Sequence, residues 1–281
     1  MKKECAQTRM GLNRTASLIL YAVLFTALAV SVPADLVQED FNSYTLGDLD
    51  GQDGWSSGLP GPVQVISGTG INTSRVVSNT DEATTGYAQK DVVLDWSGLT
   101  QASLSVDFNR IGTSSIDSWA GVQDSSLFRG YGVRVRTADI GFREGASGGD
   151  AWLHTDVDGN TINVQNEKWY RITYEFTLGA TPMITKATLY NLTDGGSSQL
   201  YFGADTPTLT PSAATNPANW DQVRVRVPGS HQGVLMYDNI SLIPEPASLG
   251  MLLIGALGVF LLRRSRGARA YRLEFLEARG R

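Results

Sequence analysis

The sequence predicts an all-β fold: an antiparallel jelly-roll β-sandwich over residues 35–243, flanked by two apolar segments. Apolar and polar residues alternate with a period of two, as at Leu104, Val106 and Phe108, which favours strands with one buried and one solvent-exposed face. The connections are rich in Gly, Asp, Asn and Ser, which form turns. The region lacks an amphipathic period of about 3.6 residues, so helices are not expected.

Four stretches alternate most regularly and are expected to be long strands. They are residues 102–109, 131–136, 170–178 and 223–228. Further strands are expected at residues 36–41, 63–67, 75–78, 87–94, 141–144, 152–157, 161–164, 186–192 and 234–242. Many short antiparallel strands in one domain of this length favour a jelly-roll sandwich. The longest connection is expected at residues 203–219.

Residues 1–34 have the pattern of a secretory signal peptide. A basic segment precedes an apolar stretch at residues 16–32, and Val32 and Ala34 then supply small residues for a cleavage site. The alternative is an uncleaved signal anchor, because the apolar stretch is long enough to span a membrane. Cys5, the single cysteine, lies in the basic segment, so the mature chain is expected to contain no disulfide.

The C-terminal region has three parts in a defined order. They are a Pro-Glu-Pro triplet (Pro244, Glu245 and Pro246), an uncharged apolar run at residues 247–262, and a basic cluster (Arg263, Arg264 and Arg266). As a transmembrane helix the run would measure about 24 Å, which is shorter than a ~30 Å hydrocarbon core. The arginines that follow it can make up the difference in length by extending their charged ends to the membrane interface. The positive-inside rule then places residues 35–243 outside the cytoplasm. The alternative is a buried C-terminal helix, which would normally keep a polar stripe.

This order of triplet, apolar run and basic cluster resembles the PEP-CTERM sorting domain of Gram-negative bacteria. The resemblance implies that an exosortase, an integral-membrane enzyme, recognises and processes residues 244–266. It further implies transient anchoring in the inner membrane, a final place at the cell surface or outside the cell, and an association with exopolysaccharide. Residues 267–281 depart from the family, whose members end soon after the arginines, and are expected to form a short cytoplasmic tail.

The charge of the predicted domain limits its partners. Residues 35–243 contain 12 Lys and Arg and 24 Asp and Glu, which gives a net charge of −12. This charge disfavours nucleic acid and anionic membrane surfaces as partners. It suits neutral glycans or divalent cations, and it is equally consistent with a role in solubility alone.

Short motifs along the domain carry a second resemblance. They are Asp40-Phe41, Gly54-Trp55, the Trp-Tyr-Arg-Ile-Thr-Tyr run at 169–174 and the Tyr-Asp-Asn-Ile-Ser-Leu run at 237–242. In this order they resemble the concanavalin A-like, laminin G-like sandwiches. The resemblance implies the fold and leaves the activity open, because that family contains lectins, glucanases and adhesion modules.

The sequence predicts a protein that is not an enzyme. Glycosidases of the superfamily it resembles carry a Glu-x-Asp-x-x-Glu strand motif, and no segment matches it. The acidic pair Asp91 and Asp95 is better explained as strand-end residues, and His154 and His231 lie far apart without a nucleophile motif. Two alternatives stay open: a lectin-like carbohydrate-binding module, and a glycan-acting hydrolase of an unrecognised type.

A structural calcium ion is expected between the first and last strands. Asp238 shares parity with Ile240, and Glu39 shares parity with Phe41, so both carboxylates are expected to face inward. An inward carboxylate needs hydrogen bonds or a cation. Jelly rolls of the kind that this domain resembles often hold calcium there, so Glu39, Asp40 and Asp238 are its candidate ligands. The alternative is hydrogen bonding to the backbone at the strand ends.

Trp55 and Trp119 are the candidate glycan-binding residues. Trp55 lies in a Gly-rich loop and Trp119 in the polar segment 111–124, where an exposed ring could stack on a sugar. The alternative for each is a core or loop anchor. The sequence thus predicts an exported, surface-sorted protein with a structural or adhesive role in extracellular polysaccharide. Its expected partners are an exosortase, the inner membrane before processing and polysaccharide, but no nucleic acid.

Overall fold

The computed structural model describes residues 36–58, 63–79, 86–112, 118–136, 139–143, 150–153, 155–179, 182–202, 208, 216–227 and 234–245. The predicted signal peptide (1–34), apolar span (247–262) and tail (267–281) lie outside these residues and stay predictions. Within the described part of the chain, no helix is long and apolar enough to cross a membrane.

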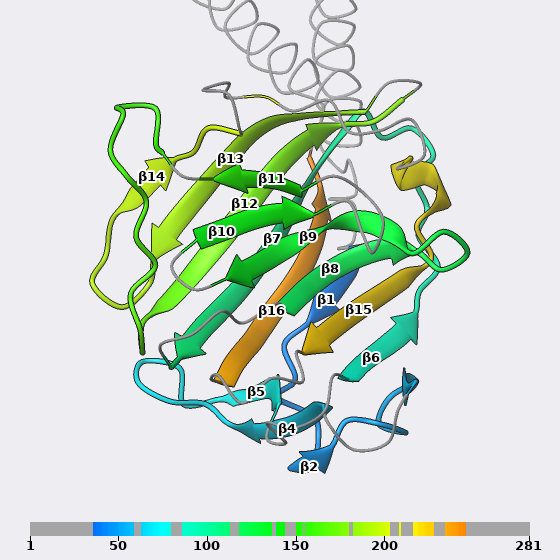
Figure 1. The fold of residues 1–281 in the computed structure, drawn as a ribbon. Helices are drawn as coiled ribbons and strands as arrows, with labels where there is room; N and C mark the ends of the chain where they lie inside the picture. The colour runs from blue at the N-terminus through cyan, green and yellow to red at the C-terminus, as the bar shows by residue number, and fades with distance from the viewer. Residues whose placement is uncertain are drawn as a thin grey trace, which may run out of the picture. The chain divides into compact units, whose positions relative to one another are not determined.

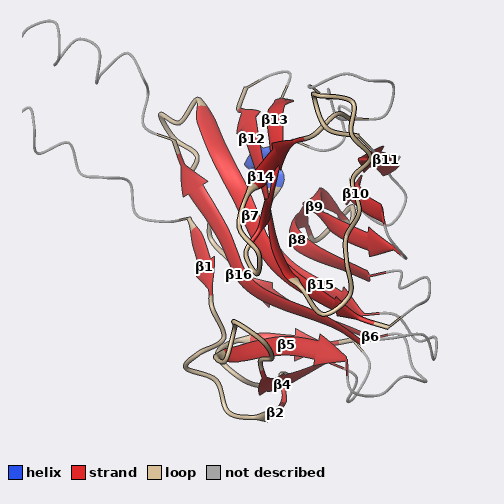
Figure 2. Ribbon diagram, turned by 90° about the vertical axis from the view of Figure 1, so that its left-hand side faces the viewer, coloured by secondary structure: helices blue, strands red, loops and turns tan. Residues whose placement is uncertain are grey.

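Two antiparallel sheets face each other and form the predicted all-β sandwich (Figures 1 and 2). The nine-stranded sheet has the order β14-β13-β12-β7-β16-β5-β4-β2, and β1 pairs with β16. Its strands are β1 (Val37–Glu39), β2 (Gly47–Asp48), β4 (Val63–Ser67), β5 (Arg75–Asn79), β7 (Gln101–Ile111), β12 (Trp169–Thr177), β13 (Met183–Asn191), β14 (Ser197–Gln199) and β16 (Val234–Pro244).

The seven-stranded sheet has the order β11-β10-β9-β8-β15-β6-β3. Its strands are β3 (Trp55–Ser57), β6 (Gly86–Asp91), β8 (Ser118–Asp124), β9 (Arg129–Arg136), β10 (Asp139–Arg143), β11 (Asp150–Leu153) and β15 (Gln222–Val227). The described residues contain a single helical turn, the 3-10 helix η1 (Pro217–Asn219).

The core lies between the sheets and is built from alternate residues of their strands. On β7, Leu104, Val106 and Phe108 are each 0% exposed. Across the interface, Tyr131 of β9 meets Phe176 of β12 edge-on, with ring centroids 5.2 Å apart. Each such side chain contributes roughly 1.5–3 kcal/mol when fully buried, so the predicted alternation is what binds the sheets together.

β8 is a central strand that the sequence did not predict. Its sequence is polar and contains Gly121, yet all seven residues are buried, with β9 and β15 on either side. Ala120 and Val122 face the core, so the alternation exists but is carried by small residues. A central position in the sheet, rather than β-propensity, makes this segment a strand. The strand expected at residues 161–164 is wrong, because only an isolated bridge forms, at Thr161.

A β-bulge in β16 reverses the facing of its side chains. The register against β7 shifts between Asp238 and Ser241, and Asn239 adopts a left-handed φ of 47°. Tyr237 and Ile240 both belong to the core, although they are an odd number of residues apart. Asp238 therefore lies on the outer face of the sheet. The prediction that Asp238 faces inward is wrong, because strict parity fails across a bulge.

A polar network connects the two sheets at one end. Glu39 of β1 accepts a hydrogen bond from the Tyr44 hydroxyl at 2.6 Å and pairs with the ammonium of Lys90 of β6 at 2.7 Å. Lys90 is also 2.7 Å from Asp53, and the Trp55 indole donates to the Tyr44 hydroxyl at 3.2 Å. Burial works against the charge on Lys90, but the hydrogen bonds to Asp53 and Glu39 outweigh it and raise the pKa of Lys90.

Replacing Lys90 with Met should lower the free energy of unfolding by about 3–5 kcal/mol, because Glu39 would stay buried without its cation. Lys186→Met is the matched control, since the Lys186–Glu175 side chains are 39% and 37% exposed. That loss should be below about 1 kcal/mol. Urea denaturation followed by tryptophan fluorescence measures both variants. Equal losses would contradict an ion pair that joins the sheets.

Candidate functional site

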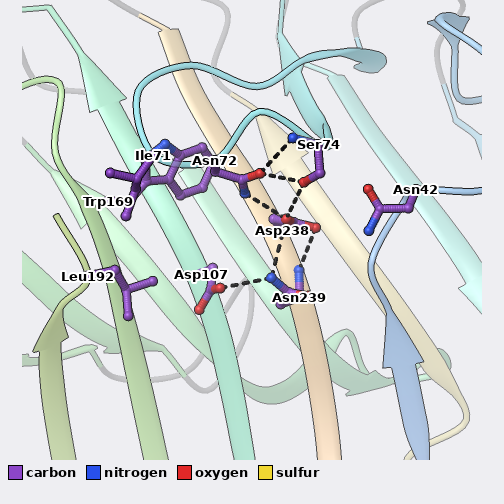
Figure 3. Close-up of a pocket in the computed structure, with 9 residues that line it drawn as sticks. All are labelled: Asn42, Ile71, Asn72, Ser74, Asp107, Trp169, Leu192, Asp238 and Asn239. Atoms are coloured by element: carbon purple, nitrogen blue, oxygen red, sulfur yellow. Dashed lines mark hydrogen bonds between the residues drawn. The ribbon is translucent and has the colours of Figure 1, made fainter.

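An open pocket of about 210 Å³ lies on the outer face of the nine-stranded sheet (Figure 3). It forms where β7, β12 and β16 meet the connection between β4 and β5. The residues that line it are Asn42, Ile71, Asn72, Ser74, Asp107, Trp169, Leu192, Asp238 and Asn239. The volume is below the roughly 300–1,000 Å³ of pockets for drug-sized ligands, so the pocket suits one small polar unit such as a single sugar ring.

The bulge in β16 places Asp238 in this pocket. The residue is 1% exposed, and its carboxylate accepts hydrogen bonds from Asn72 Nδ2 at 2.7 Å and from the backbone N–H of Asn239 at 2.8 Å. Burial raises the pKa of Asp238 to about 6; these donors oppose the rise, and the charge of Asp107 adds to it. The carboxyl therefore changes protonation in the mildly acidic range.

Asn72 attaches the connection between β4 and β5 to the sheet. Its Oδ1 accepts from the backbone N–H of Ser74 at 3.1 Å and from the Ser74 hydroxyl. This Asx turn fixes the amide, so that Nδ2 is aimed at Asp238. The backbone N–H of Arg75, the first residue of β5, donates to Asn42 Oδ1 at 3.3 Å, which ties the start of β5 to the segment after β1. Local turn chemistry therefore presents the polar side of the pocket.

Asp107 of β7 lies directly opposite Asp238 of β16. Arg171 of β12 binds the Asp107 carboxylate in a bidentate ion pair, with N–O distances of 2.6 and 2.8 Å. Asn239 Nδ2 donates to the same carboxylate at 2.9 Å. The hydrogen bond with Asp107 raises the pKa of Arg171. The charge of Asp107 is thus neutralised by Arg171 within the sheet, whereas the carboxylate of Asp238 is held by uncharged amide donors.

Trp169, Ile71 and Leu192 supply the apolar part of the pocket. Trp169 Nε1 donates to the carbonyl of Thr69 at 2.7 Å, which holds the ring against the connection between β4 and β5. Figure 3 shows Ile71 and Trp169 beside Asn72. Ile71 is 54% exposed, although it is a large apolar residue. An apolar wall beside carboxylates and amides suits a ligand with one apolar face and a rim of hydroxyls.

The three residues predicted to bind calcium do not converge. Glu39 pairs with Ile240 and faces the core, where the ammonium of Lys90 is its cation. Asp238 faces the outer pocket, and Asp40 accepts from the backbone N–H two residues further on at 3.1 Å. No group of three or more His, Cys, Asp or Glu within the described residues could hold a metal ion. The predicted site is corrected because the bulge separates its carboxylates.

Both candidate glycan-binding tryptophans are buried, at 2% exposure for Trp55 and 4% for Trp119. Trp55 belongs to the core, and its ring centroid lies 5.9 Å from that of Phe41. The prediction that Trp55 is exposed and stacks on a sugar is therefore wrong. Trp119 lies outside the core clusters, on the outer face of the seven-stranded sheet. Its indole N–H has no hydrogen-bond partner in the part of the chain that the structure describes.

The predicted sorting motif begins where a central strand ends. Pro244 closes β16 opposite Ala102 of β7, and the backbone N–H of Glu245 donates to the carbonyl of Gln101 at 3.0 Å. The other motif residues, Pro246, Arg263, Arg264 and Arg266, lie outside the described residues, as do His154 and His231.

Asn72, Asp107 and Asn239 line the pocket and were not predicted. The alternation in β7 did assign Asp107 to the polar face of its strand; Asn72 stands in a polar connection between two predicted strands, and Asn239 lies inside the last predicted strand. Those signals are local. The three residues meet only because β16 pairs with both β5 and β7, far apart in the chain.

No protein-family model matches the chain, and no curated protein matches its sequence significantly. Solved structures with a similar arrangement include a carbohydrate esterase from the Shiga toxin-encoding bacteriophage phi24B (12% identity, 75% of this chain and 99% of that chain, TM-score 0.46). Others are the globular domain of T. cruzi calreticulin (10%, 80% and 93%, 0.46) and the cellulose-induced protein Cip1 (11%, 75% and 98%, 0.44). At these values the likenesses carry no conclusion about activity.

Stability should depend on the protonation of Asp238. Its pKa is raised from an ordinary 3.8 to about 6, so the unfolded chain ionises this group more readily. The group's contribution is therefore full below about pH 4 and is lost as the pH rises through about 6. The free energy of unfolding of the wild type, minus that of Asp238→Asn, should fall by about 2 kcal/mol between pH 4 and 7. Urea denaturation across this range measures it, and a flat or rising difference would contradict it.

Proposed function

We propose that this protein is an exported, non-catalytic glycan-binding protein of the cell surface or extracellular matrix. In this proposal the tail at residues 244–266 is processed by an exosortase after transient anchoring in the inner membrane. The sandwich then binds extracellular polysaccharide and has a structural or adhesive role. The resemblance of the tail to the PEP-CTERM sorting domain supports the first part, and the pocket in Figure 3 supports the second.

The observation that carries glycan binding is the placement of Asp238. It is a buried carboxyl in an open pocket, and the contacts given by the described residues are to amide and hydroxyl donors. Sugar hydroxyls are well suited to the remaining acceptor positions of such a carboxylate, and a hydrogen bond to a charged group contributes about 1.5–3 kcal/mol. Ile71, which is 54% exposed, offers an apolar surface for the ring carbons, and the buried Trp169 supports the wall behind it.

A hydrolase is the second candidate, because two carboxyl groups face one pocket from neighbouring strands. Asp238 has a raised pKa, as a general acid requires, and Asp107 is the second carboxylate. The bidentate ion pair of Asp107 with Arg171 speaks against this role, because it withdraws both oxygens from a reacting centre. Binding without turnover is therefore preferred.

Glycan binding should be weakened in two pocket variants of the purified protein. On an array of neutral and acidic bacterial polysaccharides, Asp238→Asn should weaken binding about tenfold to a hundredfold, because it removes a charged acceptor. Ile71→Ala should weaken it about fivefold to twentyfold through lost apolar contact. Leu46→Ala is the matched control, since Leu46 and Ile71 are both 54% exposed.

Equal affinities for Ile71→Ala and Leu46→Ala would contradict the pocket as the binding site. Release of reducing ends from any bound polysaccharide by the wild type, and its loss in Asp238→Asn, would favour the hydrolase instead.

The tail should be processed only where an exosortase is present. In a PEP-CTERM-producing bacterium the full chain should be released from the inner membrane, and deletion of the exosortase gene should leave it in the membrane fraction. Immunoblotting of the fractions measures this. Release that is unchanged in the deletion strain would contradict exosortase processing, and retention in the membrane fraction of both strains would reduce the tail to an ordinary membrane anchor.

A further inference from the structure

The Pro-Glu-Pro triplet of the predicted sorting motif is partly built into the fold. Its first residue, Pro244, closes β16 opposite Ala102 of β7 and is buried. Its second residue, Glu245, is half-buried, and its backbone N–H donates to the carbonyl of Gln101 at 3.0 Å. Figure 1 shows β16 beside β7 in the middle of the sheet. Two of the three residues of the triplet therefore belong to the domain rather than to a linker.

Pro244 is compatible with the end of a strand because of its place in the register. In an antiparallel pair, hydrogen-bonded and non-hydrogen-bonded residue pairs alternate. Glu245 is hydrogen-bonded to Gln101, so Pro244 and Ala102 form a non-hydrogen-bonded pair, and the ladder with β7 needs no N–H from the proline. Pro244 shares parity with Leu242, which is 0% exposed and belongs to the core. The proline ring therefore lies on the core side of the sheet.

The last residues of β16 are held from one side. As far as Leu242 the strand lies between β7 and β1, because Val37 pairs with Leu242 and the backbone N–H of Leu36 donates to the carbonyl of Leu242 at 2.9 Å (Figure 2). In the described part of the chain, residues 243–245 pair with β7 alone. Strand ends open at a lower free energy than central segments. Residues 243–245 can therefore detach while Leu242 keeps its place in the core.

The predicted membrane span begins directly after the triplet. Only Pro246 separates Glu245, which is bonded to β7, from the apolar run at residues 247–262. One residue extends the chain by at most about 3.6 Å. An enzyme of the membrane must therefore bind the triplet close to the folded domain. The backbone groups that pair with β7 cannot pair with an enzyme at the same time, so strand pairing and enzyme binding exclude each other.

We propose that the fold itself regulates the sorting of this chain. Pairing of residues 244–245 with β7 hides the triplet, and processing of the folded chain requires the end of β16 to detach. This inference rests on the proposed processing of residues 244–266 by an exosortase. A protease that acts on a transiently opened segment works at a rate proportional to the open population. Because β16 is the last of the described strands, the triplet is hidden only once the sheet is complete.

An insertion that moves the triplet away from β7 tests the proposal in the full chain. Gly-Ser-Gly-Ser placed between Ile243 and Pro244 should speed release from the membrane fraction at least about tenfold, because the new residues pair with β7 in place of the triplet. The same insertion between Gly195 and Gly196, in the exposed turn between β13 and β14, is the matched control and should leave the rate unchanged. Pulse-chase labelling in an exosortase-producing bacterium measures the rates.

A disulfide that locks the end of β16 tests the opposite direction. Ser103→Cys and Ile243→Cys stand directly opposite each other in a hydrogen-bonded pair, whose Cα atoms are about 5.5 Å apart, as a disulfide requires. Ile243 is 40% exposed, so the core is left intact. With residue 243 fixed, the triplet extends at most about 11 Å from the sheet. Processing should slow at least about tenfold, and dithiothreitol should restore the wild-type rate.

The outcomes separate this inference from the proposed function. Absence of release from the wild type and from every variant would overturn both. Equal rates for the wild type and the insertion before Pro244 would overturn the regulation by β16 and leave exosortase processing standing. An insertion that speeds release, combined with a disulfide that has no effect, would also overturn it, because the distance to the membrane would then set the rate rather than strand detachment.

Discussion

The β-bulge at Asn239 is the constraint on which the outer face of the nine-stranded sheet depends. The bulge lets Tyr237 and Ile240 of β16 both face the core of the domain, while β16 pairs with β1, β5 and β7. Without it, one of these residues would face solvent, or Asp238 would face the core without a cation. The left-handed conformation of Asn239 is the local cost of this arrangement. Its consequence is a buried carboxyl in an open pocket.

The two sheets share one apolar core but present different chemistry outward. The nine-stranded sheet offers carboxylates, amides and an apolar wall, and Arg171 beside the pocket is paired with Asp107. The outer face of the seven-stranded sheet carries Arg224, Arg226 and Trp119, and the glycines between them on β8 and β9 are buried.

Alternation predicted the strands well where large apolar residues carry it. β4 was predicted to the residue, and β7 and β12 nearly so, because Leu104, Phe108 and Tyr174 are large and fully buried. β8 was missed because Ala120 and Val122 are small and Trp119 faces outward. The calcium site failed for a different reason. Parity counts residues along one strand, and a bulge changes the count without leaving a clear signal in the sequence.

The sequence by itself determined the all-β class, the alternation that builds the core, and the order of apolar and basic segments at the two ends. These are properties of neighbouring residues, and local periodicity records them. Tertiary structure decided that Asp238 faces outward, that Lys90 supplies the cation for Glu39, and that Trp55 is buried. It also gathered Arg224, Arg226 and Trp119 on one face. Such juxtapositions depend on which distant strands pair and in what register, and a one-residue shift reverses every side chain.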